Sequence, residues 1–197
     1  MKENSLDLDK CLEEARLFHG SLCAGARMGV RMSILGLNAI GISDPKGKDR
    51  KNIMVFVEMD RCAADAILSV TGCRPGKRTM KIMDYGKMAA TFINLKTGKA
   101  VRVAERNNDG NELITREMIQ NNPRTLDYLN RTDDELFAVS EVKVEISPED
   151  MPGSPLKSVP CAICGERVLD MRDVTVDGKY LCRPCAEGKR YYQPVNP

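Results

Sequence analysis

Residues 161–185 read CAICGERVLDMRDVTVDGKYLCRPC, and two C-x-x-C pairs in this stretch decide how the C-terminal part of the chain folds. The pairs are Cys161 with Cys164 and Cys182 with Cys185. This spacing is typical of a structural zinc site with four thiolate ligands, because each pair lets one tight turn aim two sulfurs at the same ion. Buried or disulfide-bonded cysteines are the alternative. We predict a structural zinc ion held by these four cysteines in a domain at 161–197.

The second cysteine pair leads into a short helical stretch that we expect at 186–192, and this arrangement resembles a treble clef. Modules of that kind often bind nucleic acid. From residue 161 onward, six basic residues face five acidic ones: Arg167, Arg172, Lys179, Arg183, Lys189 and Arg190 against Glu166, Asp170, Asp173, Asp177 and Glu187. Six minus five leaves a charge of +1, which is weak support for phosphate contacts. We favour a structural or dimer-contact role for this domain, with nucleic-acid binding as the alternative.

The composition limits the partners of the chain. It has 197 residues, 42% of them apolar, and its 30 basic and 28 acidic residues leave a net charge of +2. So balanced a chain does not indicate a nucleic acid or an anionic membrane as its main partner. Residues 1–10 are charged and polar, and no stretch approaches the roughly 18 apolar residues of a membrane span. We expect a cytoplasmic protein whose cysteines are metal ligands or reactive thiols.

The organisation of the chain predicts an α+β fold, with a mostly antiparallel sheet packed with helices and a small C-terminal zinc ribbon. We expect a core domain at 1–146, a linker at 147–160 that contains four prolines, and the zinc domain at 161–197. The expected helices are 6–18, 22–36, 60–71, 112–121 and 125–130, and the expected strands are 53–59, 79–83, 89–95, 99–104 and 136–146. Ser21 and Asp60 are the expected caps of the second and third helices.

Four further cysteines and the single histidine lie in the first half of the chain. His19 precedes Cys23 by four residues, and both Cys23 and Cys62 fall in the first turn of an expected helix. The partial positive charge of a helix N-terminus lowers a thiol pKa and favours the thiolate. A histidine with two thiolates suits zinc or a similar transition metal and leaves a coordination position open. Buried free cysteines are the alternative, and Cys73 is either a fourth ligand, a nearby thiol or packing.

At these residues the chain resembles a known family. Five segments, in this order, are similar to the E-subunit family of formylmethanofuran dehydrogenase: FHGSLCAG (18–25), EMDRCAADAI (58–67), TGC (71–73), DYGK (84–87) and KTGK (96–99). The similarity covers roughly residues 10 to 145, and several versions of the family also carry a C-terminal zinc ribbon. The family often has a second histidine and a proline where this chain has Ser21 and Ala24.

The resemblance implies an α+β core that is frequently dimeric and that holds a metal in a Cys/His pocket. We expect a second transition metal, zinc by preference, at His19, Cys23 and Cys62, with Cys73 close by. The candidate catalytic residues are Cys62, Cys23 and Lys87, and Asp60, Asp65 or Asp84 could orient a ligand. A homodimer is expected from the resemblance and from the three glycines of the second helix (Gly25, Gly29 and Gly36).

Two functions of different classes remain from the sequence. The first is a metal-dependent enzyme or redox subunit that acts on an unidentified small molecule at the Cys/His pocket. The second is a non-catalytic metal-binding or interaction protein that contacts nucleic acid through its zinc ribbon.

Overall fold

The computed structural model describes residues 6–107, 113, 115–121, 130–193 and 195, and it divides the chain into two compact units. The units are Met1–Glu145 and Ile146–Pro197. Among the described residues, no helix is long and apolar enough to cross a membrane.

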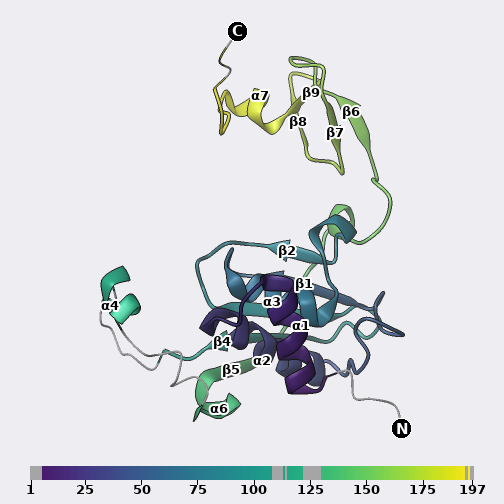
Figure 1. Ribbon diagram of the computed structural model, residues 1–197. Coiled ribbons are helices and arrows are strands. Elements are labelled where there is room, and N and C mark those ends of the chain that lie inside the picture. Colours follow the sequence, from purple (N-terminus) through teal and green to yellow (C-terminus); the bar gives the residue numbers. More distant parts are fainter. Residues whose placement is uncertain (1–5, 108–112, 114, 122–129, 194, 196–197) are drawn as a thin grey trace. The chain divides into compact units, whose positions relative to one another are not determined.

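The first unit is built around one five-stranded sheet with the strand order β2-β1-β3-β4-β5 (Figure 1). Its strands are β1 (Ile53–Val57), β2 (Met80–Ile82), β3 (Ala89–Asn94), β4 (Ala100–Glu105) and β5 (Phe137–Val142). β1 pairs with β2 in parallel, whereas β1–β3, β3–β4 and β4–β5 pair antiparallel. The fold is therefore α+β with a mixed sheet, as the sequence predicts except for the parallel pair at one edge.

Three helices lie on one face of this sheet (Figure 1): α1 (Leu8–His19), α2 (Ala24–Ala39) and α3 (Cys62–Thr71). α2 contacts β3 and β4, and α1 and α3 pack against α2 and against each other. The strand residues of that face alternate along the sequence, because successive side chains of a strand point to opposite faces. Val55 and Val57 of β1, Phe92 of β3 and Val103 of β4 are completely buried in one cluster with the helices. This cluster is the hydrophobic core that holds the three helices in place.

The glycines of α2 let the helix approach its neighbours closely. A Cβ on Gly29 would lie 2.6 Å from the carbonyl oxygen of Ala63 and 2.8 Å from the Cβ of Ala66, both in α3. A Cβ on Gly36 would lie 2.1 Å from the ring of Phe92 in the sheet. These glycines are thus used for packing within the chain, and they no longer support the expectation of a homodimer.

Two expected helix caps are wrong. The N-cap of α2 is Cys23 rather than Ser21, and its Sγ accepts a hydrogen bond from the backbone N–H of Ala26. The N-cap of α3 is Arg61 rather than Asp60, and it makes no side-chain capping bond. In both cases the helix starts later than local propensity indicates, and a cysteine occupies the first or the capping position.

Other boundaries differ more modestly from the expectation. Gly20 and Gly72 end α1 and α3 in the left-handed conformation, one or two residues after the expected ends of the helices. α4 covers Arg116–Asn121, and the helix expected at 125–130 falls outside the described residues, apart from residue 130. Residue 136, expected to begin the last strand, instead ends α6 (Asp133–Leu136), whose capping box uses Thr132 and Glu135.

Arg31 of α2 binds the segment before and at the start of α6, through Asp133 and the carbonyl of Arg131.

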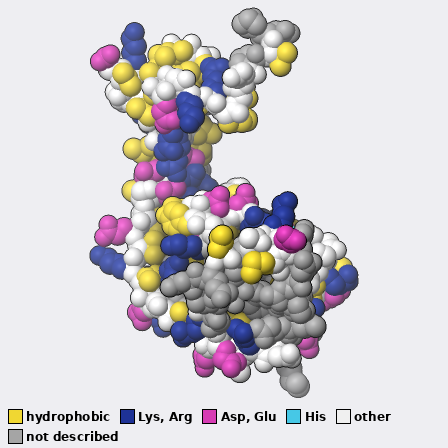
Figure 2. All heavy atoms as spheres, turned by 90° about the vertical axis from the view of Figure 1, so that its left-hand side faces the viewer, with side chains coloured by type: hydrophobic (Ala, Val, Ile, Leu, Met, Phe, Trp, Pro, Cys, Tyr) yellow, Lys and Arg dark blue, Asp and Glu magenta, His cyan; other side chains and the backbone are white. Residues whose placement is uncertain are grey.

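The second unit consists of two small hairpins and one short helix. β6 (Ser158–Pro160) pairs with β7 (Arg167–Leu169), β8 (Asp173–Val176) pairs with β9 (Lys179–Cys182), and α7 (Arg183–Glu187) follows. Residues 158–160, expected at the end of the linker, thus form a strand. Among the described residues of this unit only Cys161 and Leu181 are buried. Many apolar side chains remain on its surface (Figure 2).

Candidate metal centres

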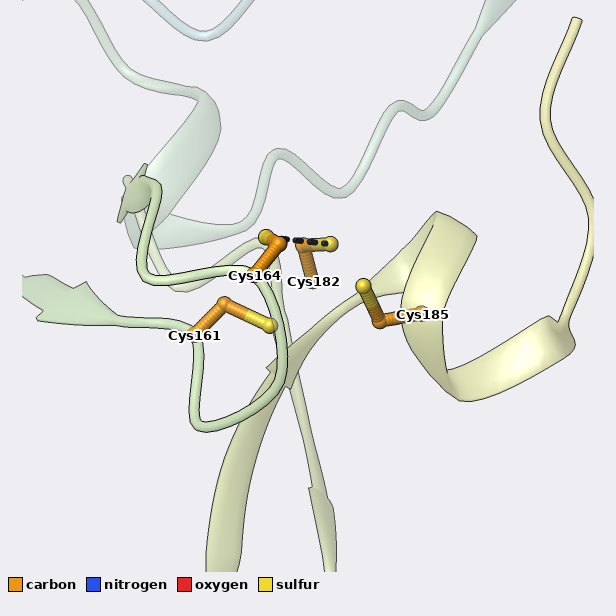
Figure 3. Close-up of side chains that lie close together, drawn as sticks. All are labelled: Cys161, Cys164, Cys182 and Cys185. Carbon is orange, nitrogen blue, oxygen red and sulfur yellow. Dashed lines mark hydrogen bonds between the residues drawn. The ribbon is translucent and has the colours of Figure 1, made fainter. Parts of the chain in front are cut away.

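The four C-terminal cysteines converge in the second unit (Figure 3). Cys161 and Cys164 lie in the turn between β6 and β7, Cys182 ends β9, and Cys185 lies in α7. One sulfur from each residue lies within 4.8 Å of all the others. The first turn is closed by a hydrogen bond from the backbone N–H of Gly165 to the carbonyl of Cys161, 2.9 Å long, with Gly165 at a φ of +77°. Glycine adopts this φ without steric cost.

The protonation of these thiols shows how closely they are coupled. Backbone N–H groups of Cys164 and Cys182 lower the pKa of Cys161 to about 6. Although the backbone N–H of Glu166 favours the Cys164 thiolate, burial and the neighbouring thiols raise the pKa of Cys164 to about 12. Four thiols this close together cannot all ionise without a cation between them. A bound metal ion reverses this balance, because it deprotonates a coordinating thiol outright.

A second group of metal-ligating side chains lies in the first unit, where three helix ends meet. His19 is the last residue of α1, Cys23 is the N-cap of α2 and Cys62 is the first residue of α3. One imidazole nitrogen and the two sulfurs lie within 4.8 Å of one another. The structure therefore brings together the three residues that the sequence proposes for one site.

Asp65 fixes the orientation of the histidine ring. Its Oδ2 lies 2.8 Å from Nδ1 of His19, while Nε2 of His19 lies 3.9 Å from Sγ of Cys23. With the Nδ1 proton directed to the carboxylate, the lone pair of Nε2 is left on the side of the Cys23 sulfur. Histidine ligands in metal sites are commonly oriented by a carboxylate in this way. Of the three acidic residues that could orient a ligand, the structure places Asp65 in that position.

The close packing of α2 on α3 sets the distance between the two cysteines. A Cβ on Gly25 would lie 3.3 Å from the Cβ of Cys62 and 4.0 Å from the sulfur of Cys23. Gly29, one turn later, lies against Ala63. Side chains larger than that of glycine at these positions would hold α2 and α3 farther apart. The spacing of these glycines in the sequence indicates that another backbone could pack closely on this helix, but it does not reveal that this backbone is α3.

The acidity expected for Cys62 is wrong. Burial, followed by the hydrogen bond and charge of the neighbouring Cys23, raises the pKa of the Cys62 thiol above its ordinary value. The backbone N–H at the helix start acts in the opposite direction but is the weaker effect. The helix N-terminus therefore does not by itself produce a thiolate at Cys62.

The donor set fits a borderline-soft transition metal. Two thiols and one imidazole are typical ligands of zinc, and ligands around one tetrahedral zinc ion lie roughly 3.5 to 4 Å apart. The donor atoms lie within 4.8 Å of one another. Small rotations of the three side chains would bring them to the separation that a zinc ion requires. Three protein ligands leave a fourth position for water or a substrate.

Cys73 does not belong to this group. It follows Gly72 at the far end of α3, and a ten-residue helix separates it from Cys62 by about 15 Å. Its sulfur lies 3.9 Å from the carbonyl of Ile53, and burial raises its pKa to about 11. Cys73 is thus a buried thiol of the core, and the expectation that it lies close to the histidine is wrong.

Lys87 and the two other acidic candidates are surface residues. Lys87 is exposed, with its Nζ 5.9 Å from the centre of the Tyr85 ring. Asp84 is exposed in the same loop. Asp60 is exposed and lines a cavity of about 340 Å³ beside α3, together with Arg61, Asp65, Leu68, Met80 and other residues. Asp65 lines this cavity and also contacts His19, whereas His19, Cys23 and Cys62 do not line it.

An ion pair that the sequence does not indicate fixes the chain just before the third helix. The guanidinium of Arg102 in β4 binds both carboxylate oxygens of Glu58, at 2.6 and 2.7 Å. Hydrogen bonds from Arg102, opposed by burial, lower the pKa of Glu58. The pair joins the residue after β1 to the sheet, four residues before Cys62.

Comparisons with known proteins agree with this architecture. A family model described as "FmdE, Molybdenum formylmethanofuran dehydrogenase operon" matches residues 18–143, which include His19, Cys23 and Cys62. A solved crystal structure from Syntrophus aciditrophicus, of a protein like the E subunit (FmdE) of tungsten formylmethanofuran dehydrogenase, is similar with a TM-score of 0.61. The two chains are 21% identical, and the similarity covers 94% of this chain and 95% of the other. At this identity the likeness shows the fold alone.

A curated relative comes from Archaeoglobus fulgidus and is called a "Probable S-adenosyl-L-methionine-binding protein". It is 26% identical over 207 residues, which covers 95% of this chain and 55% of the relative. The chain thus spans about half the length of that relative.

Proposed function

Because the chain belongs to the FmdE family, we propose that its first unit is a metal-dependent enzyme or redox subunit that acts at the pocket of His19, Cys23 and Cys62. The observation that carries the proposal is the convergence of one imidazole and two thiols within 4.8 Å, with the imidazole oriented by Asp65. We propose zinc as the metal of both sites, since thiolate and imidazole are its usual ligands.

The residues of the pocket have distinct roles in this proposal. Asp65 keeps the proton on Nδ1 of His19, so that Nε2 is free to bind. Cys23 and Cys62 supply two thiolates and release their protons on binding. A zinc ion bound here supplies Lewis acidity and lowers the pKa of a bound water to about 7.

The cavity beside α3 is the proposed place of the small-molecule substrate. It measures about 340 Å³, and Arg61 and Asp60 give it charged groups while Leu68 and Met80 give it an apolar wall. The link to the metal pocket is Asp65, which lines the cavity and contacts His19. The proposed role of Lys87, which is exposed, is to attract an anionic substrate at the surface.

The test uses cobalt as a spectroscopic substitute for zinc in the full chain. We expect two metal ions per chain, one for each group of ligands, and loss of one of them in His19→Ala. Azide added to the wild type should change the visible spectrum of the core cobalt, because an open position accepts an added ligand. Cys11→Ser is the matched control, since Cys11 is a buried thiol of α1 outside both groups. A full complement of metal in His19→Ala, or a spectrum that azide leaves unchanged, would overturn the proposal.

The second candidate function is a non-catalytic one in which the ribbon contacts nucleic acid. One observation favours it: Lys189, Arg190 and Tyr192 line a hollow of about 470 Å³ beside Cys185, which combines cations with an aromatic ring. Binding of single-stranded RNA that weakens with salt and persists in His19→Ala would support this candidate.

We also propose that the chain forms a homodimer. The support is the exposure of large apolar side chains on α1, where Leu17 is 67% and Phe18 is 54% exposed. A monomer mass in light scattering at micromolar concentration would refute the dimer.

A further inference from the structure

We infer that Cys23 and Cys62 form a reversible disulfide when the pocket holds no metal, with a low-molecular-weight disulfide as the oxidant. The pocket would then be a dithiol–disulfide site as well as a metal site. The inference concerns the thiols alone and stands whether or not the metal is catalytic.

The first argument is the distance between the two sulfurs. They lie within 4.8 Å of each other, whereas the bond requires about 2.05 Å and Cβ atoms about 3.5 to 4.5 Å apart. The Cβ of Cys62 also lies close to the backbone of α2, near Cys23. Gly25 lies two residues after Cys23, and a Cβ built on it would be only 3.3 Å from the Cβ of Cys62. The two sulfurs can therefore approach each other by rotation of their side chains and a small adjustment of the two helix starts.

The second argument is access. Cys23 and Cys62 are both partly exposed at the starts of their helices, so a small oxidant can reach them. The other two cysteines of the first unit are buried, with Cys11 1% and Cys73 3% exposed. Solvent-accessible paired thiols are the ones that undergo exchange, and buried single thiols are inert. Burial thus separates the reactive pair from the two control residues.

The chemistry balances with oxidised glutathione as the oxidant. One thiolate of the pair attacks a sulfur of glutathione disulfide, forms a mixed disulfide and releases one glutathione thiolate. The second thiolate then attacks the protein sulfur of the mixed disulfide and releases the other glutathione thiolate. Two protein thiols are oxidised, one glutathione disulfide is reduced to two glutathiones, and the two protons of the protein thiols pass to the departing thiolates.

The disulfide and the metal exclude each other, because both use the same two sulfurs. Oxidation leaves His19 and Asp65 as the remaining polar pair of the pocket, and one imidazole cannot retain the ion. We therefore expect the core metal to leave as the bond forms and to bind again after reduction. Bound metal should in turn slow the oxidation, since it occupies the attacking thiolates.

The experiment treats the full chain with oxidised glutathione, with and without a zinc chelator, and maps the cysteines by tandem mass spectrometry. Peptide mapping is needed because the four ribbon cysteines are also close together. Trypsin releases residues 17–27 with Cys23, and residues 62–77 with Cys62 and Cys73. We expect a crosslinked peptide pair two hydrogens lighter than the sum of the two peptides, which dithiothreitol separates. The Cys73→Ala variant removes any ambiguity about which cysteine is bonded.

Matched variants separate this inference from the proposed function. Cys23→Ser should abolish the crosslink, and Cys73→Ala should retain it. His19→Ala should retain the crosslink although it loses the core metal. A crosslink in a chain that binds no core metal would leave this inference standing and remove the proposed function. Core metal binding without a crosslink after chelation, or a crosslink to Cys73 in place of Cys62, would overturn the inference and leave the proposed function intact.

Discussion

Oδ2 of Asp65 lies 2.8 Å from Nδ1 of His19, although 46 residues separate them in the chain. Asp65 is in the first turn of α3, three residues after Cys62, and His19 ends α1. The same contact therefore joins two helices and selects the nitrogen with which the histidine can bind a metal. Neither residue shows this relationship in the sequence.

Replacement of Asp65 by asparagine should weaken the core metal site without unfolding the chain. The amide oxygen can still accept the Nδ1 proton, but the negative charge that supports the histidine ligand is lost. We expect the affinity for zinc to fall by about 10- to 100-fold, the usual effect of losing such a partner. Competition with a chromogenic chelator measures it. Asp60→Asn is the control, because Asp60 lines the same cavity, and an equal loss in both variants would contradict the role of Asp65.

Gly29→Ala should destabilise the first unit by about 1 to 3 kcal/mol, because the new Cβ would clash with the backbone of Ala63. Alanine is favoured over glycine in a helix by about 1 kcal/mol, so the clash must outweigh that gain. The added methyl should also separate α2 from α3 and reduce the metal affinity. Urea unfolding followed by circular dichroism gives the first effect. Gly76→Ala has open space around its Cβ and should leave both properties nearly unchanged; a stabilised Gly29→Ala would be the contrary result.

Cys164→Ser should cost the chain one metal ion and make the second unit sensitive to protease from about residue 160. The unit has so few buried residues that metal binding must supply much of its folding energy. Metal analysis and limited proteolysis measure the two effects. Ile163→Ser, at the exposed neighbouring position, is the control. An unchanged metal content in Cys164→Ser would show that these cysteines do not form the site.

Cys73 should make the stability of the first unit fall at alkaline pH. Burial raises its pKa to about 11 in the folded chain, whereas a thiol in the unfolded chain ionises near 8.5. The contribution of Cys73 to the free energy of unfolding is therefore complete below the pKa of the unfolded chain, and it is lost as the pH rises through about 11. Between pH 8.5 and 10.5 the free energy of unfolding of the wild type should fall by about 2 kcal/mol more than that of Cys73→Ala. Parallel slopes for the two proteins in urea unfolding under reducing conditions would contradict this.

Most elements of the fold are predictable from the sequence because their signals are local. The hairpin of β3 and β4, the strand β1 and the glycines that end α1 and α3 each depend on a few neighbouring residues. The parallel pairing of β1 with β2 depends on residues 25 positions apart, such as Val55 and Met80, and no local pattern specifies it. The caps of α2 and α3 escape prediction because the sulfur of Cys23 and the backbone of Arg61 occupy positions that propensity assigns to serine and aspartate.

The three candidate ligands of the core pocket could be predicted from the sequence, but the surroundings of the pocket could not. The i, i+4 spacing and the two helix starts indicate His19, Cys23 and Cys62. The family resemblance suggests that Cys73 lies nearby, whereas α3 carries it to the other end of the helix and leaves it as core packing, the alternative that the residues alone leave open. The pKa of Cys62 escapes prediction for a related reason, since burial beside a second thiol depends on the packing of α2 against α3.

The scarcity of buried residues in the second unit has a consequence for the life of the protein in a cell short of metal. The pocket of the first unit is held by helix packing and should persist empty, ready to be filled again. The ribbon has only Cys161 and Leu181 buried among its described residues and should be degraded instead. Metal shortage would thus affect the two units differently. The first unit would stay folded and bind metal again when it returns, whereas a degraded second unit would be restored only by synthesis of new chains.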